Sequence, residues 1–160
     1  MEKLQEGMEK FQGFRPVFDS NSRVLILGSF PSVKSRQAEF YYGNKQNRFW
    51  KVLCQAFDEH EPLTVEDKIR LCLSHNVALW DIVGSCRITG SMDADIKDYE
   101  LVDLQQVLSS SKIEKILCNG ATAYKLTMTA YSGELPVYKL PSTSPANVRF
   151  DKDAWLKHLR

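Results

Sequence analysis

Four short apolar segments, separated by helical patterns, leave few folds open to this chain. They span 23–29, 76–82, 113–119 and 135–141, and they are rich in β-branched and aliphatic residues. In the first three, apolar side chains are nearly continuous, whereas a strand with one solvated face would alternate apolar and polar residues. Continuous patterns of this length are typical of strands covered on both faces, as in a parallel sheet.

Amphipathic helical patterns fill the gaps between these strands and close the chain, at 46–57, 64–75, 103–110, 120–131 and 151–160. The second pattern begins with Thr64 and Asp67 in an arrangement like a capping box. Strand–helix alternation predicts an α/β sandwich with a parallel sheet and right-handed crossovers. No repeat, low-complexity tract or linker interrupts the pattern, so we expect a single domain over residues 1–160.

Composition agrees with one globular domain and excludes little else. The 160 residues are 43% hydrophobic and 26% charged, and the net charge is +1. Such a charge produces no global field toward a polyanion, although local patches can still bind nucleic acid. No apolar run approaches the ~20 residues of a membrane span, and the N-terminus is too charged for a signal peptide. We expect a cytoplasmic monomer that does not bind membranes.

The cysteines and histidines form no metal-ligand pattern. The cysteines are far apart and without a C-x-x-C pair, which predicts buried thiols, and the histidines are isolated in polar surroundings, which predicts surface positions. We therefore expect no metal and no cofactor. These residues are Cys54, Cys72, Cys86, Cys118, His60, His75 and His158.

In parallel sheets the ligand crevice lies beyond the carboxyl ends of the strands, so the segments after each strand are the candidate site. The first is followed by the turn 28–32 and then by a stretch dense in aromatics and amides, 40–50. Aromatic rings can sandwich a flat heterocycle, and amides can hydrogen-bond its edge. Phe49 and Trp50 also fit the core face of a helix, whereas that alternative does not account for Tyr41, Tyr42 and Gly43.

The last strand leads into a loop of small polar residues between two prolines, 140–147. Its hydroxyl and backbone N–H groups can hold phosphate oxygens, and Asn147 and Arg149 can probe a groove. The alternative is an ordinary Ser/Pro turn before the final helix. Asp81, at the end of the second strand, needs a partner because an unpaired buried carboxylate is costly. It either faces a ligand or braces a turn.

Four motifs together are similar to the hypoxanthine-DNA glycosylase family of the uracil-DNA glycosylase superfamily: GSFPS (28–32), YYGNKQNRFW (41–50), LWDIV with GSMDADI (79–96) and LPSTSPAN (140–147). The resemblance runs from about Phe14 to the C-terminus. It implies a three-layer α/β/α sandwich with a central four-stranded parallel sheet. It also implies a monofunctional base-excision enzyme that flips a deaminated base out of DNA, hydrolyses its N-glycosidic bond and leaves an abasic site.

Both familiar catalytic side chains of uracil glycosylases are absent. Phe30 stands where their first motif has Asp or Asn, and Leu140 stands where a histidine begins their last loop. The resemblance instead implies Asn47 as the catalytic amide, in preference to Asn44. A neutral amide that orients water can suffice if the pocket stabilises the departing purine.

The remaining site residues combine this resemblance with the local chemistry of the loops. We expect base contacts from Gly28, Ser29, Phe30, Tyr42, Phe49 and Asp81, and DNA contacts from Ser142, Thr143, Ser144, Asn147, Arg149 and Arg48. Lys34, Arg36 and Lys45 add positive charge near the first loop.

Asp81 stands where uracil glycosylases have a base-recognising Asn. An ionised Asp would accept a hydrogen bond from N1–H of hypoxanthine and repel the bare N1 of adenine. It would accept N3–H of uracil equally. The alternatives are therefore a glycosylase for uracil, xanthine or a mismatched pyrimidine, or a catalytically silent nucleic-acid-binding module.

Overall fold

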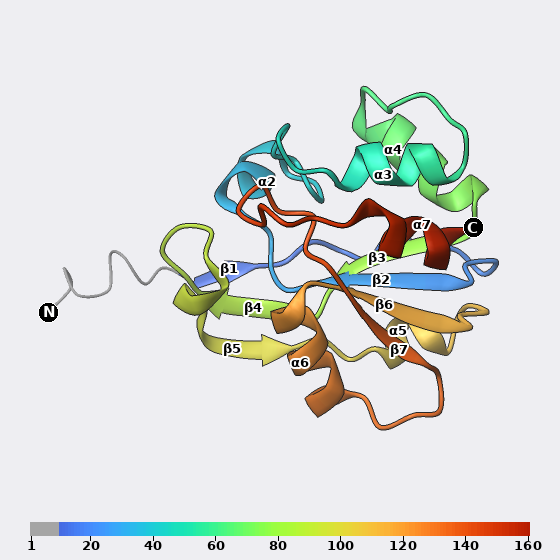
Figure 1. Cartoon of the computed structure of the whole chain (residues 1–160). Helices are drawn as coiled ribbons and strands as arrows, with labels where there is room; N and C mark the ends of the chain where they lie inside the picture. Colours follow the sequence, from blue (N-terminus) through green and yellow to red (C-terminus); the bar gives the residue numbers. More distant parts are fainter. Residues whose placement is uncertain (1–9) are drawn as a thin grey trace, which may run out of the picture.

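The centre of the molecule is a four-stranded parallel sheet in the order β3-β2-β6-β7 (Figure 1). Its strands are β2 (Val24–Gly28), β3 (Val77–Asp81), β6 (Lys115–Asn119) and β7 (Val137–Leu140). All three pairings are parallel, which confirms the sheet predicted from the apolar segments. This computed structural model describes residues 10–160. The charged N-terminus, which we expect not to be a signal peptide, lies almost entirely outside the described residues.

Both faces of this sheet are covered, as the continuous apolar patterns require. Ile26 and Leu79 belong to one buried cluster, whereas Leu25, Leu27 and Ala78 belong to another. Successive side chains of a strand point to opposite faces, so each strand contributes to both clusters. β7, whose pattern is less continuous, is half exposed at the edge of the sheet.

Helices form the outer two layers. The first cluster includes side chains from α3 (Phe49–Ala56), α4 (Val65–Ser74) and α7 (Lys152–Leu159), and the second from α5 (Gln105–Leu108) and α6 (Ala121–Ala130). Figure 1 shows α3, α4 and α7 on one side of the sheet and α5 and α6 on the other. The three-layer α/β/α sandwich is therefore confirmed.

A second, antiparallel sheet was not predicted. It has the order β1-β4-β5 and is formed by β1 (Lys10–Gln12), β4 (Val83–Arg87) and β5 (Lys97–Leu101). β4 begins two residues after β3 ends, so part of the segment that follows this strand is itself a strand and not a loop. Val83 and Cys86 are buried in the second cluster, and this burial draws the chain into a strand.

Two short helices also lie in segments for which the sequence predicted no helix: α2 (Val33–Ala38) and the 3-10 helix η1 (Asp93–Asp95). The predicted cap of α4 is confirmed, since the Asp67 N–H donates to Thr64 Oγ1 at 3.0 Å.

The cysteines are free thiols, three of them buried and Cys54 partly exposed. His60 is exposed, whereas His75 and His158 are partly buried against Phe57 and Tyr138. Within residues 10–160, no helix is long and apolar enough to cross a membrane.

Candidate active site

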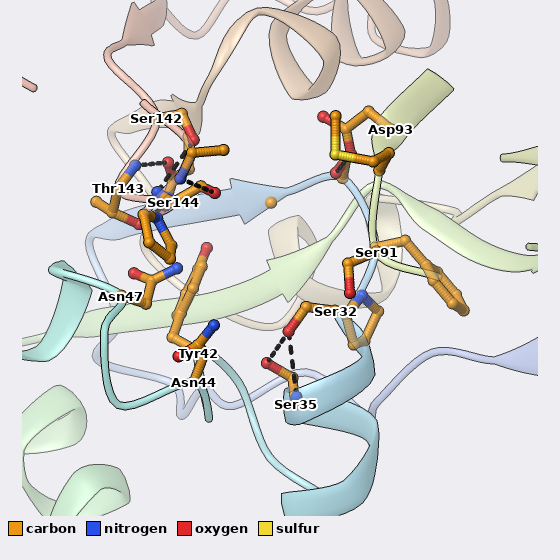
Figure 2. A pocket seen from close by; sticks show the side chains of 18 of the residues that line it. Ser32, Ser35, Tyr42, Asn44, Asn47, Ser91, Asp93, Ser142, Thr143 and Ser144 are labelled. Atoms are coloured by element: carbon orange, nitrogen blue, oxygen red, sulfur yellow. Dashed lines mark hydrogen bonds between the residues drawn. The ribbon is translucent and has the colours of Figure 1, made fainter. Parts of the chain in front are cut away.

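A cavity of about 560 Å³ lies beyond the carboxyl ends of β2, β3 and β6. Segments far apart in the sequence line it, as Figure 2 shows for the labelled side chains. The lining includes residues that were predicted for catalysis, for base contacts and for DNA contacts: Gly28, Ser29, Phe30, Tyr42, Asn47, Asp81, Ser142, Thr143, Ser144 and Asn147. Phe49, Arg48 and Arg149 do not line it.

Gly28 ends β2 at the crowded floor of this cavity. A Cβ atom built on Gly28 would lie 2.4 Å from Asp81 Oδ1 and 3.0 Å from the Tyr42 hydroxyl oxygen. Gly28 and Asp81 are register partners on neighbouring parallel strands. The absence of a side chain at residue 28 therefore lets a carboxylate and a phenol approach the same strand end.

Asp81 is the most unusual group in the cavity. Its side chain is only 5% exposed, and Oδ2 has no hydrogen-bond partner among residues 10–160. Burial, and secondly the negative charge of Asp93, raise the pKa of this carboxyl to about 7. A buried polar atom without a partner is rare in folded proteins and indicates strain or a functional role.

Tyr42 presents an aromatic ring to the cavity from a strained backbone. Its φ is 53°, a left-handed conformation that bulky residues rarely adopt. The ring stacks on Phe49 with centroids 4.0 Å apart. Burial, followed by the charge of Asp81, raises the pKa of its phenol.

The predicted base contact of Phe49 is not supported by this geometry. The side chain is only 1% exposed and packs in the first core cluster, against Trp50 and Trp155. Because Phe49 lies behind the Tyr42 ring, it supports the cavity wall without lining the cavity. Tyr41 is likewise buried, and its hydroxyl donates to the Arg15 carbonyl at 2.7 Å.

Asn47 lies at the start of α3 and at the wall of the cavity, beside Tyr42 (Figure 2). Its Oδ1 accepts a hydrogen bond from the Phe49 N–H at 2.9 Å. Asn and Asp side chains commonly accept from the backbone N–H two residues on, in an Asx turn. The helix start thus fixes the amide, and the structure brings together Asn47, Asp81, Tyr42 and Phe30 around one cavity.

The last loop differs from its prediction because much of its polarity is used internally. Thr143 is 1% exposed; its N–H donates to Asn119 Oδ1, and Asn119 Nδ2 donates to its Oγ1, each at 2.9 Å. The Thr143 hydroxyl therefore cannot reach a phosphate in this conformation. Ser142 and Ser144 accept from the N–H groups of Ser144 and Ala146 through their hydroxyl oxygens. Each of these hydroxyls keeps its own proton to donate.

The arginines also differ from expectation. Arg48 Nη1 donates to the carbonyls of Ser144 and Asn147 at 3.1 and 2.8 Å, and its guanidinium lies 5.0 Å from the Phe150 ring centroid. Arg36 donates to the carbonyls of Pro31 and Gly90. Both cations thus brace loops, since a guanidinium can satisfy several carbonyls at once.

Asn147 and Arg149 complete the last loop. Asn147 Nδ2 donates to the Ser142 carbonyl at 2.9 Å, and its Oδ1 accepts from the Arg149 N–H. Arg149 is exposed outside the cavity. Lys34 and Lys45, in contrast to the two bracing arginines, have exposed side chains near the first loop.

Sequence reasoning missed the residues that the segment 91–94 and the end of β6 bring to the cavity. Ser91, Met92, Asp93 and Asn119 all line it. The Ser29 hydroxyl donates to Asp93 Oδ1 at 2.6 Å. The motif GSMDADI contains a pair of carboxylates and follows a strand of the sheet, and this pair could have indicated that the segment contributes to the site.

Comparisons with known proteins agree with this architecture. The profile of the Uracil DNA glycosylase superfamily matches residues 15–160. A hypoxanthine DNA glycosylase of Methanosarcina acetivorans is 34% identical over 89% of this chain and 91% of its own length. One of Methanosarcina barkeri is 31% identical over 88% and 90%. A solution NMR structure from M. acetivorans, described as a candidate uracil DNA glycosylase, superposes with a TM-score of 0.84 at 31% identity, over 95% of this chain and 98% of that one.

The parallel α/β sheet with a cavity at its strand ends, together with these matches, defines the class of protein. The chain belongs to the uracil DNA glycosylase superfamily and is a DNA glycosylase. The resemblance seen in the sequence is confirmed, and DNA is the substrate that this family implies. The alternative of a catalytically silent binding module is set aside.

Proposed function

We propose that this enzyme excises hypoxanthine from deoxyinosine in DNA. It acts as a monofunctional, single-domain monomer in base-excision repair and leaves an abasic site. The observation that carries the proposal is the unpartnered Oδ2 of Asp81 in the strand-end cavity. The names of the two Methanosarcina relatives support the same base.

Asp81 discriminates between hypoxanthine and adenine by hydrogen-bond polarity. When ionised, it accepts a hydrogen bond from N1–H of hypoxanthine, whereas adenine presents a lone pair at N1. When the wrong ligand leaves a buried polar group unpaired or repelled, the site can discriminate against it by a factor of about 10⁴. The Tyr42 ring, backed by Phe49, stacks on the flipped base, and Phe30 adds a second aromatic ring to the pocket lining.

Asn47 orients the water that attacks the sugar. Its carbonyl oxygen is held by the Phe49 N–H, so the orientation of the amide is set before DNA binds. Cleavage passes through an oxocarbenium-like sugar, and preorganised polar groups stabilise such states at little reorganisation cost. An amide in a fixed orientation is therefore suited to position the water.

DNA contacts come from the hydroxyl protons of Ser142 and Ser144 and from the exposed cations around the cavity, including Arg149. Arg48, Thr143 and Asn147 contribute by holding the loop in shape. Neutral contacts to phosphate position a duplex without reading its sequence.

A base-excision assay tests the proposal. Labelled duplexes that carry one inosine, uracil, xanthine or adenine are incubated with excess enzyme, and abasic sites are cleaved with alkali. We expect the fastest single-turnover excision with inosine and none above background with adenine. A faster reaction with uracil than with inosine would contradict the assignment of the base.

A further inference from the structure

We propose that Asp93 is a second catalytic residue, whose carboxylate accepts the proton of the attacking water and faces the positively charged sugar. It replaces, from a different loop, the acid that is missing at Phe30. The inference goes beyond the base assignment and rests on the proposed function only for the hydrolytic reaction itself.

The carboxylate is tied to the first turn of the site. Asp93 lines the cavity, and its Oδ1 accepts from the Ser29 hydroxyl at 2.6 Å. Oδ2 makes no hydrogen bond with any residue of the described chain. One oxygen is thus anchored beside Phe30, and the other is available to a ligand.

Two further hydrogen bonds hold the segment 90–93 against α2, which follows the first turn. The Val33 N–H donates to Ser91 Oγ at 2.9 Å, and Arg36 Nη2 donates to the Gly90 carbonyl at 2.9 Å. Figure 2 shows Ser91 and Asp93 across the cavity from Asn47 and the 142–144 loop. The position of Asp93 therefore depends on three contacts to residues 29–36, and not on its own exposed turn alone.

The chemistry requires such a group. Asn47 can orient a water molecule, but a neutral amide is too weak a base to take its proton. Phe30 has no polar atom. Two carboxylates line the cavity, Asp81 and Asp93. Asp81 is buried, and its proposed role is to recognise the nucleobase. Asp93 is therefore the carboxylate that remains for the water.

The two carboxylates have different environments, as paired acids with separate roles require. Asp81 is buried, and this burial, followed by the charge of Asp93, raises the pKa of its carboxyl. Asp93 is exposed at the rim, where solvent and a ligand can reach its carboxylate.

The step is hydrolytic and needs no further reactant. The bond between C1′ and N9 breaks, and its electron pair leaves with the purine. Water oxygen forms the new bond to C1′ of the cationic sugar, and its proton passes to the Asp93 carboxylate. That proton then returns to solvent or to the departed purine, which restores the enzyme.

Asp93→Asn tests the proposal, because Asn keeps the shape and an oxygen for Ser29 but removes the charge and the basicity. We expect the single-turnover rate to fall by about 10²–10³-fold, within the range for a general base. Binding to a duplex with an abasic-site analogue should stay equal or tighten, since a negative charge near the phosphates is lost.

Asp95→Asn is the matched control. It removes the same charge from the same 3-10 helix, but Asp95 does not line the cavity. We expect its rate to stay within about threefold of the wild type. Equal losses in both variants, or a rate within about threefold for Asp93→Asn, would overturn the proposal.

Ser29→Ala gives an independent readout, because it keeps the carboxylate and removes its anchor. Ser29 is a positioning residue, so we expect a loss of about tenfold that Ser29→Thr restores. All variants are measured on whichever of inosine, uracil and xanthine the wild type excises fastest. A wrong base assignment would then change the substrate and leave the Asp93 result readable.

Discussion

The two loops that face each other across the cavity are built in opposite ways (Figure 2). The 140–147 loop is braced from within, by the Asn119–Thr143 pair, by Arg48 and by Asn147. The 90–95 segment is exposed and is held by three contacts to residues 29–36. The 140–147 loop is thus held in one shape by its own contacts, whereas the 90–95 segment brings an exposed carboxylate, Asp93, to the cavity.

The largest effect is expected at Asn47, which lies on the same side of the cavity as the 140–147 loop (Figure 2). Asn47→Ala should lower the single-turnover rate by about 10³-fold, because the water loses its orienting amide. It should also lower the free energy of unfolding by about 1 kcal/mol, because the Phe49 N–H at the start of α3 loses its acceptor. Excision kinetics and denaturant unfolding measure the two losses separately.

Thr64→Ala is the matched control for that change. Thr64 is the N-cap of α4; its side chain also accepts from a backbone N–H of a helix start, but it does not line the cavity. Thr64→Ala should cost about 1 kcal/mol of stability and leave the rate unchanged. An Asn47→Ala rate equal to that of Thr64→Ala would show that Asn47 serves only to hold the start of α3.

Asp81 should connect base selection to pH. Above its pKa of about 7 the carboxylate accepts N1–H and repels adenine, whereas the neutral acid can donate to adenine N1. The preference for inosine over adenine should therefore fall as pH drops from 8 to 6. The other titratable groups that face Asp81 are Asp93, Tyr41 and Tyr42.

The same raised pKa predicts a stability effect with a definite sign. Between about pH 4 and 7 the folded protein binds a proton at Asp81 more tightly than the unfolded chain does, so the free energy of unfolding decreases as pH rises. Asp81→Asn removes this dependence and should be more stable than the wild type at pH 8 by about 1–3 kcal/mol. Equal pH dependence in the two proteins would exclude a raised pKa.

Much of this architecture could be predicted from the sequence, because burial leaves periodic patterns. Three of the sheet strands were found from continuous apolar runs, and α4 from its cap. β4, with the sequence VGSCR, was missed because Gly84, Ser85 and Arg87 leave no continuous apolar run, and α2 because six residues carry little periodicity. Local patterns therefore sufficed only for the main sheet and its helices.

The site was less accessible, since several roles depend on partners that are distant in sequence. Thr143 is buried only because Asn119 pairs with it, and Arg48 is occupied only because the last loop folds over it. Asp93 reaches the cavity through Ser29, 64 residues away. No spacing rule in one sequence encodes such contacts.

Arg48 offers a test of the braced loop. Arg48→Lys keeps the charge but loses the paired contacts to two carbonyls and the stacking on Phe150, and Arg and Lys are not equivalent at such sites. We expect KM for DNA to rise by about tenfold with little change in the single-turnover rate. Lys45→Ala, an exposed cation nearby, controls for charge alone.

The smallest effects separate the hydroxyls of the last loop from one another. Thr143→Val preserves shape but leaves the Asn119 amide without its acceptor, so the free energy of unfolding should fall by about 1–3 kcal/mol, with DNA affinity changed by less than threefold. Ser144→Ala should show the opposite pattern, because the Ser144 hydroxyl proton is available to a phosphate. We expect DNA affinity to fall about threefold and the free energy of unfolding to fall by less than about 0.5 kcal/mol. Titration of a fluorescent duplex and thermal unfolding distinguish the two patterns. If Thr143→Val weakened DNA binding more than Ser144→Ala did, the hydroxyl of Thr143 would contact DNA after all, and the braced loop would have to open when the duplex binds.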